Sequence, residues 1–303
     1  MKPKYTGRAL SFEEQINLLQ SQGLEIEDRN RALQVLRNVS YARLKNYLIP
    51  LMADRKSHRF KQGATFEMAY TIYGFDRRLR ELIFHEMEKI EISFRTRFAY
   101  ATAEDGDGYW FLESRYFKSE RAHGNILRKI SSEIRRTDNE GIVNFRSKFS
   151  NPFPPCWLTM EATTIGTLSI MYEELCDGHY KNKIADYYGV DAETLESWLE
   201  HIVYVRNYCA HHSRLWNKPL GIRMTPPRRA RHYFPQLDGH SQSRIYSTLC
   251  VIKYLQNTIK PTNTFGHRLK SLIGHFDTSR IIDISQMGFP RGWEDDPIWT
   301  DKE

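Results

Sequence analysis

The regular spacing of apolar residues between Phe66 and Ala103 constrains the fold of this chain more than any other feature. Large apolar side chains recur there three or four residues apart, at Leu79, Leu82, Ile83, Met87, Ile90, Phe94 and Phe98. This spacing places them on one face of an α-helix, and the glycine-containing run at 104–108 should break that helix. The pattern predicts one long helix with a buried stripe, against which other helices have to pack.

Much of the remaining sequence has the same helical period. Ser11 and Glu14 make a capping-box pattern before a first helix, and Pro50 should end a helix that begins near Ser40. Further helices are expected at 28–39, 120–136, 191–213 and 241–259, and an apolar stretch lies at 165–172. Because no segment reads convincingly as a strand, we predict an all-α fold in the form of a helical bundle with extra N-terminal helices.

The domain organisation follows from these patterns. We expect an N-terminal helical segment at 1–60 packed on the core, a helical core at 61–276 and an acidic polar tail at 277–303. The core should contain the helix at 191–213, which carries the most informative residues of the chain.

The cysteine usage and hydropathy indicate a soluble, cytoplasmic protein. The four cysteines are widely scattered and form no CxxC pair, which is typical of reduced thiols and of neither a disulfide framework nor a zinc cage. No signal peptide is visible, and no stretch approaches the ~20 apolar residues of a membrane span.

The positive charge of the chain is concentrated in one region. Residues 206–276 contain 12 Lys and Arg against one acid, Asp238, whereas residues 277–303 contain 3 basic and 7 acidic residues. Residues 1–205 are balanced, with 29 of each sign. A local basic surface of this kind suits a polyanion, because each neutralised phosphate releases counterions. A solvated face that only keeps the protein soluble would have the same charge.

The run at 206–217, RNYCAHHSRLWN, places polar groups inside an otherwise apolar helix. Projected on a helix, Leu195, Trp198, Leu199, Ile202, Val205 and Cys209 form one stripe. Arg206 falls inside this stripe, so its charge has to be paired or reach a groove. Asn207 and His211 share the opposite face, flanked by Tyr204 and Tyr208. This second face suits the same helix of a second copy, with a shared cleft.

These residue types together can cleave RNA without a metal. A histidine can take the proton of a 2′-hydroxyl, and a second histidine can protonate the leaving 5′-oxygen. The planar fork of an arginine suits the pentacoordinate phosphate between these steps. Asn207 can hold an imidazole or contact the phosphate. The pattern implies no cofactor and no metal.

The Arg…His spacing alone is not specific, since it recurs at Arg80…His85 and Arg268…His275. Three other interpretations of the run at 206–217 therefore stay open. It can be a structural His/Arg network between helices. It can belong to a catalytically silent module that holds a structured small RNA. Least favoured is a metal site that uses Cys209, His211 and His212, for which no fourth ligand is suitably spaced.

Four blocks of the sequence resemble one known family. RNYCAHHSRLWN at 206–217 resembles the RNxxAHHxRLWN block of the Abi-like (AbiD/AbiF) abortive-infection family. The segments at 39–50, 90–96 and 157–169 resemble its YYRLxxYxxP, IExxxRT and WMxxExxxFGxLS blocks, in the same order. Ala42 and Ile165 stand where that family usually has aromatic residues. The resemblance covers roughly residues 8–275.

The resemblance implies a helical domain of the HEPN type, a role in phage defence and toxic endoribonuclease activity. By matching position it makes Arg206 and His211 catalytic, with Asn207 in support. It also implies a homodimer with a composite cleft, because HEPN sites usually combine two Arg…His motifs. For binding of single-stranded or structured RNA we expect the residues His212, Arg214, Arg223, Arg228, Arg229 and Arg231. Glu91 and Arg95 are expected to give structural support.

Overall fold

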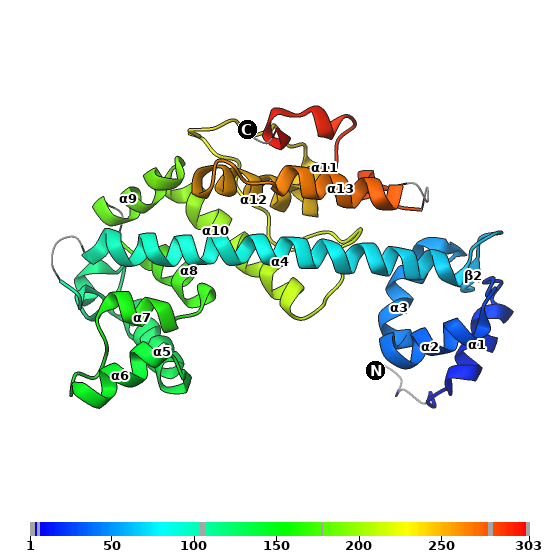
Figure 1. Ribbon diagram of the computed structural model, residues 1–303, viewed down its shortest axis with the longest axis horizontal. Coiled ribbons are helices and arrows are strands. Elements are labelled where there is room, and N and C mark those ends of the chain that lie inside the picture. The colour runs from blue at the N-terminus through cyan, green and yellow to red at the C-terminus, as the bar shows by residue number, and fades with distance from the viewer. Residues whose placement is uncertain (1–3, 5–6, 104–106, 177, 278–280, 301–303) are drawn as a thin grey trace. The chain divides into compact units, whose positions relative to one another are not determined.

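A computed structural model describes residues 4, 7–103, 107–176, 178–277 and 281–300 of the chain (Figure 1). The N-terminal helices are α1 (Phe12–Ser21), α2 (Arg29–Val39), α3 (Tyr41–Leu48) and α4 (Phe66–Ala103). They are followed by α5 (Glu120–Arg136), α6 (Glu140–Lys148), α7 (Cys156–Ala162), α8 (Ile165–Glu174) and α9 (His179–Tyr188). The last are α10 (Ala192–Ala210), α11 (Gly239–Gln242), α12 (Ile245–Ile259) and α13 (Phe265–Asp277). Among the described residues the only strands are β1 (Met52–Asp54) and β2 (Arg59–Phe60), so the all-α prediction is confirmed apart from one short hairpin.

The long helix has the bounds that the sequence predicts. Leu79, Ile83, Met87, Ile90, Phe94 and Phe98 of α4 are buried, as the helical spacing requires. The predicted helix at 120–136 is also confirmed with its bounds, and Ser119 caps it by accepting a hydrogen bond from the backbone of Ala122. Breakers and caps that stand directly beside these helices made both of them predictable.

The chain forms two compact units, and the boundaries between them differ from the expected ones. Unit 1 comprises Met1–Leu79 and Leu272–Asp283, and unit 2 comprises Arg80–Ser271 and Ile284–Glu303. Two of the three crossings lie within helices, α4 and α13, where no change of composition marks them, and the third lies between Asp283 and Ile284.

Unit 1 begins with a small helical cluster. The predicted capping box closes α1, since the Ser11 hydroxyl accepts from the Glu14 backbone and the Glu14 carboxylate accepts from the Ser11 backbone. In the same unit the Tyr47 hydroxyl of α3 donates to the buried Asp76 carboxylate of α4 at 2.6 Å. This bond fixes α3 to the first part of the long helix.

In unit 2, α10 lies at the centre of the packing. It contacts α8, α9 and α12, while α5 packs on α7 and α8, and α6 packs on α7 (Figure 1). The buried His201 of α10 lies between the Ile222 carbonyl at 3.0 Å and the Thr248 hydroxyl of α12 at 2.8 Å. The helix that carries the motif is therefore held on several sides.

Two expectations for the C-terminal region require correction. The predicted helix at 241–259 is two helices, α11 and α12, and a further helix, α13, follows them. The segment after α13 was expected to be a polar tail, but Trp293 and Trp299 are buried and the Trp299 indole donates to Tyr246 of α12 at 3.1 Å. Its aromatic side chains pack inward, and the short 3-10 turns expose most of the acidic ones.

All four cysteines are free thiols, three of them buried and Cys176 exposed. None of the helices in the described part of the chain combines the length and the apolar character that crossing a membrane requires.

Candidate functional site

The apolar stripe predicted for the motif helix is buried along its whole length. Leu195, Trp198, Leu199, Ile202, Val205 and Cys209 are all buried on α10. The helix begins after Asp191, whose carboxylate accepts from the Thr194 backbone at 2.9 Å and from its hydroxyl at 2.7 Å. The Asp191 side chain therefore caps the motif helix.

The far end of the motif helix differs from the prediction. The helix ends at Ala210, so His211, His212 and Ser213 do not continue it. The backbone of His212 donates to Cys209 and that of Ser213 donates to Tyr208, a pair of bonds known as the Schellman motif. His212 takes the left-handed conformation, with φ 53°, that glycine usually provides at this position. Because this position holds a histidine and not a glycine, the sequence does not indicate that the helix ends here.

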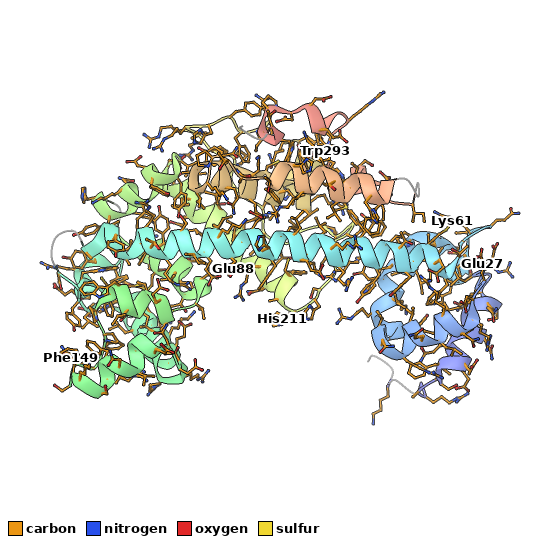
Figure 2. All side chains as sticks on the ribbon, viewed as in Figure 1. Glu27, Lys61, Glu88, Phe149, His211 and Trp293 are labelled. Carbon is orange, nitrogen blue, oxygen red and sulfur yellow. The ribbon has the colours of Figure 1, made fainter. Side chains whose placement is uncertain are left out.

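Asn207 and His211 remain close despite this early stop. The His211 backbone donates to the Asn207 carbonyl at 3.0 Å, so the two residues still stand one turn apart. Both are exposed, and Figure 2 shows His211 at the tip of the turn after α10. No hydrogen bond or ion pair engages either side chain within the part of the chain that the structure describes.

Arg206 lies on a different side of the helix, as its place in the apolar stripe predicts. Its guanidinium carbon lies 5.6 Å from the centre of the Phe84 ring of α4. It lines a pocket of about 350 Å³ together with Phe84, Glu88, Glu91, Ile92 and Arg95. Its Nε is buried without a hydrogen-bond partner among the described residues. No hydrogen bond or ion pair joins Arg206 to His211 in this part of the chain.

Glu91 and Arg95 tie the pocket wall to the neighbouring helices. The Arg95 guanidinium donates to the Met160 carbonyl at 2.8 Å, to the Thr163 carbonyl at 3.1 Å and to Glu91 at 3.0 Å. Both carbonyls belong to buried residues at the end of α7. These bonds fit the supporting role expected for the pair, although Glu91 and Arg95 also line the pocket beside Arg206.

Arg80 is a residue whose position the sequence did not reveal. It is only 5% exposed, and its guanidinium donates to the Ser213 carbonyl at 3.4 Å. It thereby holds the turn that carries His211 and His212. Its place beside Leu79 on the buried side of α4 is the signal that could have identified it.

The loop that follows the motif runs back along α10. The Lys218 ammonium donates to Tyr208, and the Gly221 backbone donates to Tyr204. Further along, the Trp198 indole donates to the Thr225 carbonyl, and the backbone of Arg231 reaches Gly189. The loop therefore follows the helix from its end to its beginning.

Three arginines expected to bind RNA help to fix this loop. Arg228 pairs with Glu193 at 2.9 Å, Arg229 pairs with Asp186, and Arg231 donates to the backbone carbonyls of Asp186 and Tyr187. All three are exposed, and ion pairs at exposed positions contribute only about 0–1 kcal/mol, so a phosphate can compete with the two carboxylates. The structure places Arg223 in the same loop, exposed, and Arg214 half-buried just after His212.

Two tyrosines and a lysine form a chain of hydrogen bonds on the second side of α10. Tyr204 donates to Tyr208 at 3.1 Å, and Lys218 donates to Tyr208 at 3.0 Å. The hydrogen bonds from Tyr204 and Lys218 together lower the pKa of the Tyr208 phenol. The spacing of Tyr204 and Tyr208 had placed them beside the motif, but their link to Lys218 depends on the path of the loop.

The arginines of the other two Arg…His copies make structural contacts with other residues. Arg80 is buried under the turn, and Arg268 forms an ion pair with the buried Glu86. The metal interpretation has no geometric support, because Cys209 is buried whereas His211 and His212 are exposed. In the described ranges no three His, Cys, Asp or Glu residues gather as metal ligands would.

Comparison with known proteins identifies one relationship. A family model described as Abi-like protein matches residues 34–217. The match contains all four blocks quoted above and ends with the last residue of the motif run, so it is shorter than the resemblance expected over 8–275. No curated protein and no solved structure matches the chain.

Proposed function

The chain belongs to the Abi-like protein family, which implies a role in phage defence, and from this premise we propose that it is a metal-independent endoribonuclease. The observation that carries the proposal is the state of three side chains at the end of α10. Arg206 lines a pocket, and among the described residues no ion pair engages it and no hydrogen bond engages the exposed side chains of Asn207 and His211. A guanidinium left without an anion in a partly buried position is costly unless a ligand supplies one.

The proposed reaction is the attack of a ribose 2′-oxygen on the adjacent phosphorus. His211 accepts the 2′-hydroxyl proton as the O–P bond forms, and the bond from phosphorus to the 5′-oxygen breaks. A second histidine donates a proton to this leaving oxygen, so the products are a 2′,3′-cyclic phosphate and a 5′-hydroxyl. Arg206 stabilises the charge that develops on the phosphate oxygens, and Asn207 orients the imidazole or the phosphate.

We infer further that the working site is shared between two copies of the chain. Within the described part of one chain, Arg206 and His211 lie on different sides of the helix end, and no hydrogen bond or ion pair joins their side chains. A symmetric dimer that pairs the ends of two α10 helices would supply two arginines and two histidines to one cleft. This arrangement also provides the second histidine that the reaction needs.

The test is cleavage of single-stranded RNA in the presence of EDTA. We expect cyclic-phosphate ends from the unchanged protein, and a loss of cleavage of about 100-fold or more in Arg206→Ala and in His211→Ala. Arg229→Ala is a matched control because it removes an arginine of the neighbouring loop, and it should keep its cleavage rate at saturating RNA. Full activity in either motif variant would contradict the assignment.

A catalytically silent RNA-binding module is the second candidate. It is favoured because no hydrogen bond or ion pair joins Arg206 to His211 within the described part of the chain. It is also favoured by the carboxylates of Glu88 and Glu91, which share the pocket with Arg206. Under this alternative, RNA that co-purifies with the protein stays intact during long incubation of a confirmed dimer. Binding of that RNA would then weaken when Arg223, Arg228 and Arg231 are replaced by alanine.

A further inference from the structure

The first sixty-odd residues of unit 1 follow an order of elements that recurs in nucleic-acid-binding modules. Helix α1 is followed by a short extended segment at Glu25, then by α2, α3 and the hairpin β1–β2. The Glu25 backbone donates to Ala64 at 2.9 Å and accepts from Phe66 at 2.9 Å, and the Phe60 backbone donates to Gln22 at 3.0 Å. The hairpin is therefore bonded to the segment between α1 and α2. This order is that of a helix–turn–helix with the hairpin in the position of a wing.

The junction between α2 and α3 is short and sharply turned. Ser40 alone separates the helices, with φ 64°, and its hydroxyl accepts from the Arg43 backbone to cap α3. Helix–turn–helix motifs usually have three or four residues at this point, so the turn is tighter here. Figure 1 shows α3 leading from this turn into the hairpin.

Helix α3 has a buried side and an exposed, basic side. Leu44, Tyr47 and Leu48 are buried, and the bond from Tyr47 to Asp76 fixes this side to α4. The exposed side presents Ala42, Arg43, Lys45 and Asn46. Arginine and asparagine are residue types that read base edges in a major groove.

The loop of the hairpin is basic, and hydrogen bonds to Asp54, its only acidic residue, fix the shape of the turn. The Asp54 carboxylate accepts from the backbones of Lys56 and Ser57, at 2.9 and 3.1 Å, and from the Ser57 hydroxyl at 2.6 Å. These bonds lower the pKa of Asp54 and use its charge to shape the turn. Arg55, Lys56 and Arg59 are exposed around it.

Charge adds a second argument to the topology. Residues 41–61 contain six Lys and Arg and one acid, Asp54, within a region whose overall charge is balanced. Within the described residues, no ion pair engages Lys45, Arg55, Lys56 or Arg59. The ammonium of Lys61, which is labelled in Figure 2, donates to the Pro50 carbonyl at 3.0 Å.

We propose that α3 and the hairpin loop bind double-stranded DNA, with α3 in the major groove and the loop on the adjacent phosphates. The major groove of B-form DNA is about 12 Å wide and admits a helix, whereas that of A-form RNA is too deep and narrow for side chains to read. Helix α3 is about 12 Å long, which suits a contact with a few base pairs. The proposal does not depend on the RNA-cleaving activity, which rests on residues of unit 2.

The test uses the full chain and a fluorescein-labelled DNA duplex of two helical turns with mixed sequence, read by fluorescence anisotropy. With Lys45, Arg55, Lys56 and Arg59 on phosphates, affinity should fall about 150-fold between roughly 50 and 200 mM salt. In the triple variant Lys45→Ala, Arg55→Ala, Lys56→Ala the same change of salt should cost only about fourfold. Unfolding of the variant in urea checks that unit 1 is intact.

Two controls make the result specific. The variant Arg121→Ala, Lys129→Ala, Arg136→Ala removes three exposed cations of α5 in unit 2 and should bind DNA like the unchanged protein. The variants Arg206→Ala and His211→Ala should also bind DNA normally, and the α3–hairpin variant should still cleave RNA, so the two proposals can fail separately. No DNA binding at about 50 mM salt, or an equal loss in the α5 variant, overturns the DNA site. An RNA duplex of the same sequence that binds at least as tightly as DNA would overturn the choice of DNA.

Discussion

His212 occupies a backbone conformation that costs a side-chain-bearing residue roughly 1–2 kcal/mol. The bonds from His212 to Cys209 and from Ser213 to Tyr208 hold it there, and Arg80 donates to the carbonyl of the next residue. Strain of this kind persists where the surrounding structure imposes it, and it is frequent at functional sites. Here it turns the chain sharply just after His211.

We predict opposite effects of glycine at the two histidines. His212→Gly should be more stable than His212→Ala by about 1 kcal/mol, because both remove the imidazole and only glycine relieves the left-handed backbone. At position 211, where φ is −89°, the order reverses, and His211→Gly should be less stable than His211→Ala by about 0.5–1 kcal/mol. Urea unfolding of the four proteins measures both differences. The same order at both positions would show that the turn does not have this conformation.

The individual residues show which features of the candidate site could be predicted from the sequence. The apolar stripe of α10 and the intrusion of Arg206 follow from helical projection alone, and both are found. The end of the helix did not follow, because the left-handed position is filled by histidine and no glycine or proline marks it. Phe84 and Arg80 were missed since the sequence does not tell which side of α4 meets α10.

At the scale of elements, α10 is held by a buried histidine. The His201 ring is fully buried, with one nitrogen donating to the Ile222 carbonyl and the other accepting from Thr248. Burial lowers the pKa of His201 to about 4, against an ordinary value of 6.5. The neutral ring thus joins the motif helix to the loop that runs back along it and to α12.

This pKa shift predicts acid sensitivity. The unfolded chain protonates His201 near pH 6.5 and the folded chain only near pH 4, so stability is full above about pH 6.5 and falls as the pH drops toward 4. A shift of this size corresponds to a loss of about 3 kcal/mol. Urea unfolding at a series of pH values measures it. His201→Gln should be less stable at neutral pH and should show a flatter profile over this range, and an unchanged slope in that variant would assign the acid sensitivity to other groups.

The elements themselves were largely predictable, and their connections were not. Capping residues and breakers defined α2, α4 and α5 to within a residue and marked the start of α1. The path of the loop at 218–231 depends on hydrogen bonds to Ser197, Trp198, His201 and Tyr204, which are distant in sequence. Composition marked this loop as basic but gave no sign that its arginines pair with α9 and α10.

At the scale of the whole molecule, the proposed dimer can be tested by mixing the unchanged chain with the His211→Ala variant. If one cleft needs His211 from both copies, only dimers of two unchanged chains cleave RNA. After unfolding and refolding together, equal amounts should show about a quarter of the full activity. RNA cleavage of the mixture, compared with the same total amount of each protein refolded alone, measures this. A mixture with about half of the full activity, in a sample shown to be dimeric, would mean that one histidine suffices for each site or that each site lies within one chain.

The division into two units was beyond the reach of the sequence. Domain boundaries are usually sought in exposed linkers rich in glycine, proline or polar residues. Here two of the three boundaries fall inside α4 and α13, where the helical period continues without interruption. The overall helical class was predictable because it depends on the period alone.

The burial of Trp293 and Trp299 against α12 means that this part of the core can be completed only late in the synthesis of the chain. Helix α12 packs on the motif helix, yet its aromatic cover is made roughly 50 residues after Tyr246. At about 5–20 residues per second, a ribosome needs roughly 3–10 seconds to add them. A growing chain therefore passes through an interval in which Tyr246 and its neighbours lack their cover. Chains that stop before Trp293 never leave this state, and the apolar surface they expose makes them targets for chaperones and proteases.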